Sequence, residues 1–367
     1  MKERLSRLRK AMMKEKLAGL LIRVTESGQS TQPNNQNVLY LSGFGGSTAV
    51  LLVTARQAFI VADARYYERA RLEAPHFRLV KMKRGEKATT CINRALKLAR
   101  LTKRSKVAFE SSRLPHDVYL AWSKELEANL VATSHLVERL RQYKDEAELK
   151  YLTKACRATS KVYDEVAALI KPGMREVDVA LEIDMRLRKH GASDNSFSSI
   201  VASGPNSAIP HHATGNRRLK AGEPVVMDFG GVFDGGYCSD ITRTVFVPGK
   251  KPSAKMQEIY QIVLEANRQA RLALKPGVKY REYDEVARDY IIRRGYGKYF
   301  THGLGHSLGL EAHDPYDYVG DPFDVGAVVT DEPGIYIEGV GGVRIEDDLV
   351  VTENGARRLT GAPYWKF

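Results

Sequence analysis

The most informative segment of the C-terminal part of this chain is AGEPVVMDFGGVFDGGYCSDITRTVFV, residues 221–247. Two runs of strand-forming residues flank a glycine-rich turn, which predicts a pair of β-strands. Asp228 lies at the end of the first run and Asp240 at the start of the second, so the pairing places two carboxylates in one sheet. One Asp in a strand is usually an edge or turn residue, whereas such a pair indicates a site for cations.

A second informative segment is THGLGHSLGLEAHD, residues 301–314. It contains His302, His306 and His313, three of the nine histidines in the chain. The glycines between them allow the backbone to approach a ligand closely. This density of imidazoles predicts a binding or catalytic segment.

The third segment is VVTDEPGIYIEGVGGVRIEDDLVVT, residues 328–352. Glu332 precedes a Pro-Gly pair that ends a strand, and Glu346 lies on the strand that follows. Four carboxylates and one imidazole form an oxygen-rich ligand set, which suits two adjacent divalent cations such as Mn, Co or Zn. The candidate metal ligands are Asp228, Asp240, His306, Glu332 and Glu346.

Helical and strand-like patterns alternate through the first 140 residues, which predicts an α/β domain with helices on both sides of a sheet. Strand-like runs are AGLLIRV, NVLYLSGF, STAVLLVT, QAFIVADARYY and KVAFE. Helical patterns cover the N-terminus, residues 86–101 and PHDVYLAWSKELEA.

The pattern changes to long helices near residue 140, where we place the domain boundary. Apolar residues such as Leu149, Leu152 and Ala155 recur at helical spacing, and this helix should end at a Lys-Pro-Gly turn. A helix from Glu176 to about Lys189 follows. A second helical pair covers residues 253–274, again ending in Lys-Pro-Gly, and 281–294, which indicates an internal duplication.

Composition narrows the class of protein. The chain has 367 residues, of which 43% are hydrophobic and 28% charged, as in ordinary globular proteins. No apolar run approaches the roughly 20 residues of a membrane helix, and the charged N-terminus does not resemble a secretory signal. Three widely spaced cysteines indicate reduced thiols, so we expect a cytoplasmic protein that does not bind membranes.

The net charge of +13 is confined to one part of the chain. Residues 1–140 carry a net charge of +14, and the remainder carries −1. A basic surface can hold polyanions non-specifically. The sequence contains no zinc finger and no clear aromatic stacking platform, so we expect a solvated basic surface and no specific nucleic-acid partner.

Five local strings occur in order along the chain: VVMDFGG, YCSDITRT, THGLGHSLGL, VVTDEPGIY and GGVRIEDD. They resemble the metallopeptidase family with the pita-bread fold, in its aminopeptidase P and prolidase branch. YLSGFGGSTAVLLVT and DARYYERA resemble the N-terminal domain of that branch, so the resemblance covers nearly the whole chain. It implies an α/β domain with a mixed sheet at 1–140, an α+β pita-bread catalytic domain with pseudo-two-fold symmetry at 141–367, and a homodimer.

The resemblance assigns roles to the metal ligands. Asp228 would chelate one ion, and Asp240 and Glu346 would bridge both. His306 would be the sole nitrogen ligand, and Glu332 would bind the second ion and accept a proton from the attacking water. Two divalent ions per chain are implied, with Mn favoured and Co or Zn as alternatives.

The resemblance also implies substrate-contacting residues. His313 would donate a hydrogen bond near the scissile carbonyl, and His211 would lie near the leaving group. His302 would contact the substrate or support the site from behind. Arg344 would brace a carboxylate or meet the substrate, and Tyr336 would orient the water network.

One departure from the family pattern affects the first segment. The spacing of twelve residues between Asp228 and Asp240 is one longer than in the family. An inserted residue in a hairpin most naturally forms a bulge that re-aims the next side chain. We therefore predict that Tyr237 lies near the metals, the alternative being a solvent-facing turn, and that Asp234 is a turn residue. Three surplus acids should be solvated or lie behind the ligands: Asp331, Asp347 and Asp348.

The implied activity is dinuclear metal-dependent hydrolysis of Xaa-Pro peptide bonds, on dipeptides or short peptides with proline second. We favour an Xaa-Pro dipeptidase because Arg344, His211 and Tyr237 together can close the site to longer chains. Aminopeptidase P is the main alternative. A non-catalytic pita-bread binding protein and a metal-free creatinase-like hydrolase are disfavoured by the complete ligand set. Methionine aminopeptidase is disfavoured because it lacks the N-terminal domain.

Overall fold

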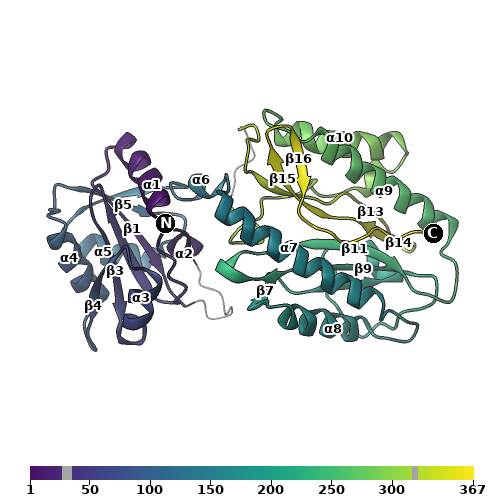
Figure 1. Ribbon diagram of the computed structural model, residues 1–367, viewed down its shortest axis with the longest axis horizontal. Coiled ribbons are helices and arrows are strands. Elements are labelled where there is room, and N and C mark those ends of the chain that lie inside the picture. The colour runs from purple at the N-terminus through teal and green to yellow at the C-terminus, as the bar shows by residue number, and fades with distance from the viewer. Residues whose placement is uncertain (27–34, 316–320) are drawn as a thin grey trace. The chain divides into compact units, whose positions relative to one another are not determined.

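The computed structural model describes residues 1–26, 35–315 and 321–367 (Figure 1). The chain divides into two compact units, Met1–Arg141 and Gln142–Phe367. Each unit has its own buried apolar core. None of the helices within the described ranges combines the length and apolar character needed to cross a bilayer.

The first unit is built on a six-stranded mixed sheet with strand order β4-β3-β2-β1-β5-β6. Strands β1–β2 and β2–β3 pair antiparallel, and the outer pairs are parallel. Continuous burial of the middle strands explains why their sequences are apolar runs rather than alternating patterns. The strands are β1 Gly19–Val24, β2 Ala49–Thr54, β3 Ala58–Asp63, β4 Arg78–Met82, β5 Lys106–Glu110 and β6 Asn129–Thr133.

Helices cover this sheet as the alternating pattern predicts. Ile92 of α4 and Trp122 of α5 pack in one cluster with Leu52 and Phe59 of the sheet. Helices α1 and α2 contact each other, and α2 also contacts β1. The helices of this unit are α1 Lys2–Lys14, α2 Gln36–Ser42, α3 Tyr67–Glu73, α4 Ala88–Leu98, α5 His116–Glu125 and α6 Glu138–Arg141.

The prediction of a strand at NVLYLSGF is wrong, because this run forms α2. Asn35 caps the helix by accepting a hydrogen bond from the Asn37 amide. Gly43 ends it with φ +83° and donates its N–H to the Leu39 carbonyl. Both capping residues lie outside or at the edge of the apolar run, and a short buried helix cannot be distinguished from a strand by apolar residues alone.

The second unit consists of two similar groups of elements. Helices α7 and α8 contact strands of the sheet β11-β9-β8, while α9 contacts β12, β13, β14 and β16 (Figure 1). The helices are α7 Glu146–Ala167, α8 Glu176–Lys189, α9 Ala254–Ala273 and α10 Tyr280–Arg293. The strands are β7 Asp194–Asn195, β8 Ile200–Ser203, β9 Pro224–Phe229, β10 Gly231–Val232, β11 Ile241–Phe246, β12 Val328–Asp331, β13 Gly334–Ile337, β14 Gly341–Arg344, β15 Asp347–Thr352 and β16 Gly355–Arg358.

The two Lys-Pro-Gly turns have the same structure, in agreement with the internal duplication. After α7, Gly173 has φ +88° and donates its N–H to Leu219. After α9, Gly277 has φ +89° and donates its N–H to Phe323. In each half the turn leads into a second helix, α8 or α10, so the halves repeat the same local architecture.

Strands β9 and β11 form the antiparallel pair that residues 221–247 predict. In this register Asp228 lies opposite Thr242, and Asp240 directly precedes β11. The two halves meet beside this pair, where the Glu346 amide donates to the Thr242 carbonyl at 2.9 Å. The carboxylates of the first half therefore lie at the junction with the second half.

Candidate metal centre

The five candidate ligands line one cavity of about 630 Å³ in the second unit. Asp228 and Asp240 come from the β9–β11 pair, and the other three come from the second half of the unit. His211, His302, His313 and Arg344 line the same cavity. Of the predicted site residues, only Tyr237 and Tyr336 are not in its wall.

The tightest group within this cavity contains Asp240, His306 and Glu346. One possible ligand atom from each of these residues lies within 4.8 Å of the others. His306 Nε2 is 3.7 Å from Asp240 Oδ2 and 3.5 Å from Glu332 Oε1. Two carboxylates therefore face one imidazole nitrogen and a third lies close by, which is a donor set suited to Mn, Co or Zn.

The segment that carries His306 is fixed to strand β12 by backbone contacts. The His306 amide donates to Thr330 Oγ1 at 2.9 Å, and the Thr330 amide donates to the His306 carbonyl at 2.8 Å. Gly305 permits this approach, since a Cβ on it would lie 2.1 Å from the Thr330 carbonyl oxygen. Close packing against Thr330 therefore requires a glycine at position 305, directly before His306.

The orientation of the His306 ring leaves one nitrogen free for a cation. Its Nδ1 lies 3.1 Å from the Ser307 carbonyl, so Nδ1 carries the proton and Nε2 presents its lone pair to the carboxylates. Burial lowers the pKa of His306, which keeps the imidazole neutral. A neutral, oriented imidazole is the form that binds metal.

Asp228 has a cationic partner. Its Oδ2 accepts from Arg344, whose guanidinium also donates to Thr242 Oγ1 and the Tyr336 hydroxyl. Arg344 therefore braces a carboxylate, one of the two roles expected for it. Thr242 Oγ1 donates in turn to Glu346 Oε2 at 2.7 Å, so a single network orients two candidate ligands.

The electrostatics of the cavity fit bound cations. Burial, together with neighbouring carboxylates, raises the pKa of both Asp240 and Glu346. Burial raises the pKa of Glu332 to about 8. Asp240 Oδ1 is buried and has no hydrogen-bond partner among the described residues. Divalent cations would satisfy that oxygen and neutralise the clustered negative charge, so the donor set fits a metal site.

Asp348 supports the centre from behind. Its Oδ2 accepts from the Asp240 amide at 3.3 Å and from the Cys156 thiol at 3.1 Å. Of the two roles expected for the surplus acids, solvation is wrong, because Asp331, Asp347 and Asp348 are fully buried, whereas Asp348 lies behind the ligands as the other role requires. Asp347 pairs with the buried Arg243 at 2.7 Å. The long-range partners of these acids are not apparent in the sequence.

Family comparisons agree with this geometry. Residues 150–353, more than half of the chain, match the metallopeptidase family M24. Residues 4–143 match the creatinase/prolidase N-terminal domain. The chain belongs to metallopeptidase family M24. Its second unit has the pita-bread fold, and membership of the M24 family implies use of divalent metal.

Several similar proteins carry functional names. An Xaa-Pro dipeptidase of Pyrococcus horikoshii is 36% identical over 89% of this chain and 90% of the relative. The solved structure of an Xaa-Pro dipeptidase from Bacillus anthracis has a TM-score of 0.89 at 36% identity, covering 99% of this chain and 98% of that one. An X-Pro aminopeptidase structure from Thermotoga maritima has a TM-score of 0.86 at 30% identity, covering 96% and 98%.

Two histidines of the M24 unit lie beside the candidate ligands. The ring of His313 stacks on His306 with centroids 3.7 Å apart, and burial lowers the pKa of His313 to about 4. His211 is exposed and lines the cavity. His212 faces Glu176 instead, at 3.0 Å. The placement of the first two fits contact with a bound substrate.

A chain of hydrogen bonds runs from Arg344 through Tyr336 to His302. Arg344 donates to the Tyr336 hydroxyl at 3.0 Å, which donates to His302 Nε2 at 2.8 Å. His302 Nδ1 donates to the Gly303 carbonyl, and burial lowers the pKa of His302 to about 4. His302 reaches the cavity wall, whereas Tyr336 supports the M24 site from behind Arg344.

Tyr237 does not line the cavity, contrary to its predicted place near the metals. The extra residue is accommodated in a turn where Gly235 and Gly236 have φ +74° and +80°. The ring of Tyr237 stacks on Tyr151 of α7, and its hydroxyl donates to Glu148 at 3.1 Å. Two successive left-handed glycines take up the insertion, so no strand bulge directs this side chain into the site.

The sequence analysis missed the apolar wall of the M24 cavity. Phe197, Ile200, Pro210 and Ala312 line it beside the polar groups. Phe197, Ile200 and Pro210 lie outside the segments that the sequence analysis singled out. The only sequence signal for this apolar wall was that Pro210 directly precedes His211. Apolar residues in a cavity wall do not form a recognisable sequence motif.

Proposed function

We propose that this chain is an Xaa-Pro dipeptidase that binds two divalent cations, Mn in the first instance, in the cavity of its second unit. The observation that carries the proposal is the convergence of four carboxylates and the neutral imidazole of His306 on one cavity. Two cations in such a site would supply a water-derived nucleophile at neutral pH and polarise the scissile carbonyl.

Glu332 is proposed as the proton acceptor. Its Oε1 accepts from Thr330 Oγ1, and burial raises its pKa to about 8. Bound cations would keep Glu332 ionised, and its carboxylate could then take a proton from water and return it to the leaving nitrogen. The neighbouring Pro333 and Gly334 fix the direction in which it leaves the strand.

His313 and His211 are proposed to bind the peptide. His313 is neutral at working pH because its pKa is about 4, so a ring N–H can donate to the carbonyl oxygen as negative charge develops. His211 lies next to Pro210 at the cavity wall, near the proposed leaving group. Phe197 and Ile200 offer an apolar surface for the proline ring.

The preference for dipeptides is supported by the relatives. The P. horikoshii and B. anthracis proteins are both named Xaa-Pro dipeptidase. Arg344 gives less support than the sequence indicated, because its guanidinium already binds Asp228 and Tyr336. The T. maritima structure, named X-Pro aminopeptidase, keeps aminopeptidase P as the second candidate.

A cytoplasmic homodimer completes the proposal. The three cysteines are free and buried, which suits a reducing compartment. Dimerisation rests on the family resemblance alone. Mass photometry of the purified chain at several concentrations tests it, and a single monomeric species would contradict it.

The deciding experiment compares Ala-Pro with Arg-Pro-Pro as substrates at saturating Mn. We expect faster turnover of Ala-Pro, no activity after chelation, and recovery when Mn is restored. The Glu332→Gln variant should lose about 100-fold or more in kcat. Faster cleavage of the tripeptide would favour aminopeptidase P, and undiminished proline release after exhaustive chelation would refute the metal-dependent mechanism.

A further inference from the structure

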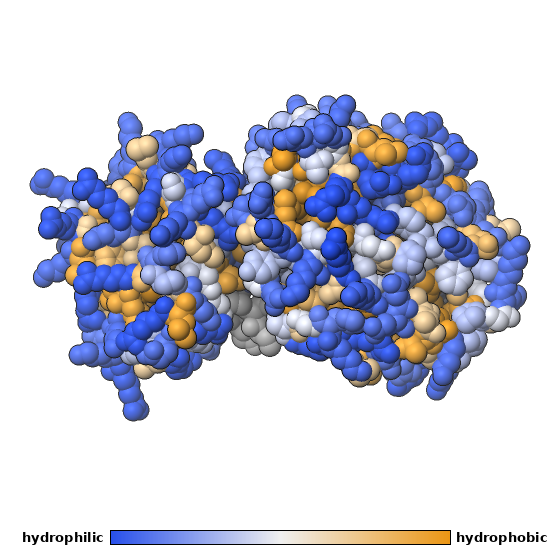
Figure 2. All heavy atoms as spheres, viewed as in Figure 1, coloured by the Kyte–Doolittle hydropathy of each residue, from blue (hydrophilic) through white to orange (hydrophobic). Residues whose placement is uncertain are grey.

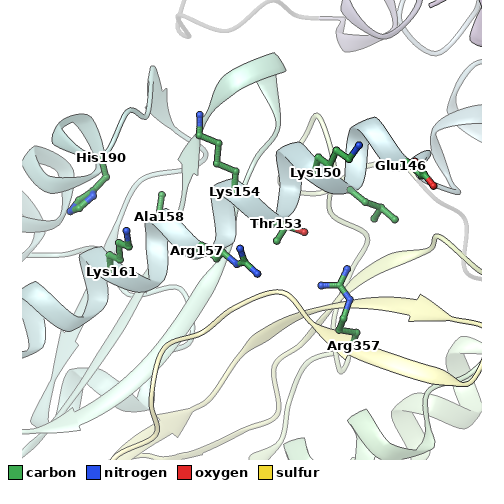
Figure 3. Close-up of a pocket in the computed structure, with 10 residues that line it drawn as sticks. Glu146, Lys150, Thr153, Lys154, Arg157, Ala158, Lys161, His190 and Arg357 are labelled. Atoms are coloured by element: carbon green, nitrogen blue, oxygen red, sulfur yellow. The ribbon is translucent and has the colours of Figure 1, made fainter.

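A second large cavity lies on the outside of the catalytic unit, away from the metal centre. It is a groove of about 800 Å³ along helix α7, and Arg357 of strand β16 forms its opposite side (Figure 3). No residue of this groove lines the metal cavity. Its volume is within the range of small-molecule sites.

The groove is lined mainly by positive charge. Lys150, Lys154, Arg157 and Lys161 follow one another at intervals of four, three and four residues, which places them on one face of α7. Together they span about 16 Å of helix. Hydrophilic side chains lie across α7 in Figure 2. Glu146 is the one acidic residue among those that line the groove in the described part of the chain.

Two guanidinium groups converge in this groove. Arg157 and Arg357 are directed toward each other across it (Figure 3). Within residues 1–26, 35–315 and 321–367, neither forms an ion pair, and neither do Lys150 and Lys161. Lys154 alone of the α7 cations is paired, with Asp234 at 2.5 Å. Like charges gathered in this way attract an anion.

The other helices of the same unit show a different arrangement. Five arginines on or at the start of these helices pair with acids three or four residues away, which neutralises them locally. These pairs are Arg175–Asp178, Arg186–Glu182, Arg268–Glu265, Arg281–Glu285 and Arg288–Asp284. On α7 two pairs of residues four apart carry like charges, Lys150 with Lys154 and Arg157 with Lys161, while Glu146 and Glu165 lie four positions from Lys150 and Lys161. A helix face that only contacts water has no need of like-charged residues four positions apart.

We infer that this groove binds a small anion that carries two or more phosphate groups. Opposed guanidinium groups recognise phosphate by paired N–H donors, and lysines add charge along the chain of phosphates. The Thr153 hydroxyl and the apolar Leu149 and Ala158 lie in the same wall. The length of the cationic row exceeds the size of one phosphate, so an oligophosphate fits better than orthophosphate.

Calorimetric titration of the full-length, metal-free chain tests this inference. Metal is removed because phosphates would otherwise bind cations at the peptidase site. The probes are inorganic tripolyphosphate and ATP, each at physiological salt. We expect saturable binding of both, with equal affinity if the phosphate chain alone is recognised and tighter ATP binding if the nucleoside also contributes.

The Arg157→Ala/Arg357→Ala variant should bind at least about tenfold more weakly. The matched control is Arg293→Ala/Lys275→Ala, which removes the same charge from exposed positions outside the groove and should bind as the wild type does. Circular dichroism checks that both variants fold. Absence of saturable binding, or equal weakening in both variants, would overturn the inference. Tighter binding of a single-stranded oligonucleotide than of tripolyphosphate would also overturn the assignment to a small ligand.

Discussion

Thr242 holds a candidate metal ligand, Glu346, in position. Its hydroxyl donates to Glu346 at 2.7 Å and accepts from Arg344 at 3.1 Å, and the residue is fully buried. We expect Thr242→Val, which keeps the shape, to weaken metal affinity about 10–100-fold, as loss of an orienting hydrogen bond does at other metal sites. Titration with Mn measures this directly.

Thr244, two residues further along the same strand, provides the control. Among the described residues, its hydroxyl exchanges hydrogen bonds only with the Arg344 backbone. Thr244→Val should therefore leave metal affinity within about twofold, because no ligand loses a partner. Equal weakening in both variants would show that strand stability, and not the Glu346 contact, controls the affinity.

Glu110 makes the stability of the first unit depend on pH. Burial, and then the charge of Glu138, raises its pKa from 4.5 to about 7. The native state therefore binds more protons than the unfolded state between these values, so the free energy of unfolding falls as pH rises through this interval. Over the whole interval the free energy of unfolding falls by about 3 kcal/mol.

Urea denaturation between pH 5 and 8 measures this effect. Trp122 is buried in the first unit, and Trp365→Phe leaves it as the sole tryptophan reporter. Glu110→Gln should flatten the pH dependence even though it disturbs the hydrogen bonds from Asn35 and Asn37. An unchanged slope in that variant would assign the effect to another group.

Sequence reasoning identified single residues where the chemistry itself is distinctive. The five ligands are an unusual combination of carboxylates and imidazole, and all of them line one cavity. For the surplus acids, the alternative of solvation was wrong, although a charged residue is normally solvated. Asp347 is buried against Arg243, which is more than 100 positions away, and one sequence does not reveal that pair.

At the scale of elements, Gly305 controls how the His306 segment packs on strand β12. A Cβ there would lie 2.1 Å from the Thr330 carbonyl oxygen and 2.6 Å from its hydroxyl. We expect Gly305→Ala to displace the segment, with a loss of about 1–3 kcal/mol in stability and a fall in metal content. Thermal denaturation and elemental analysis measure the two effects.

Gly215→Ala is the corresponding control. The nearest atom to a Cβ at Gly215 is 3.8 Å away, so the methyl group has room. Stability should change by less than about 0.5 kcal/mol, and metal content should not change. A similar loss of stability and metal content in Gly215→Ala would mean that replacing any glycine by alanine has this effect. The close contact with Thr330 would then not explain the Gly305→Ala result.

Elements were predicted best where the pattern is long. The helix expected to begin at Glu176 and end near Lys189 is α8, with those bounds. The short run that became α2 was misassigned because its caps, and not its apolar residues, distinguish helix from strand. Tyr237 was misplaced for a related reason: a count of residues reveals an insertion but not the backbone angles that absorb it.

At the scale of the whole molecule, metal should stabilise one unit selectively. All candidate ligands lie in Gln142–Phe367. Cations at about 100 times their Kd add roughly 2.7 kcal/mol to the free energy of unfolding. For a unit of this size that raises Tm by about 5–10 °C.

Each unit contains one tryptophan, which allows the two transitions to be followed separately. Trp365 packs against the cores of the second unit and should report the shift, whereas Trp122 in the first unit should not. Single-tryptophan variants, Trp122→Phe and Trp365→Phe, isolate the two signals. A shift of equal size at both tryptophans would indicate that the units unfold together, and no shift would contradict binding at this site.

The division of the ligands between the two halves of the catalytic unit has a consequence for its biogenesis. Asp228 and Asp240 precede α9, whereas His306, Glu332 and Glu346 all follow it. A nascent chain that has formed only its earlier half presents two acids without any imidazole, a poor match for a transition metal. The cations can therefore bind only after the two halves have come into contact. Metal binding should accordingly be a late step of folding and not the event that starts it.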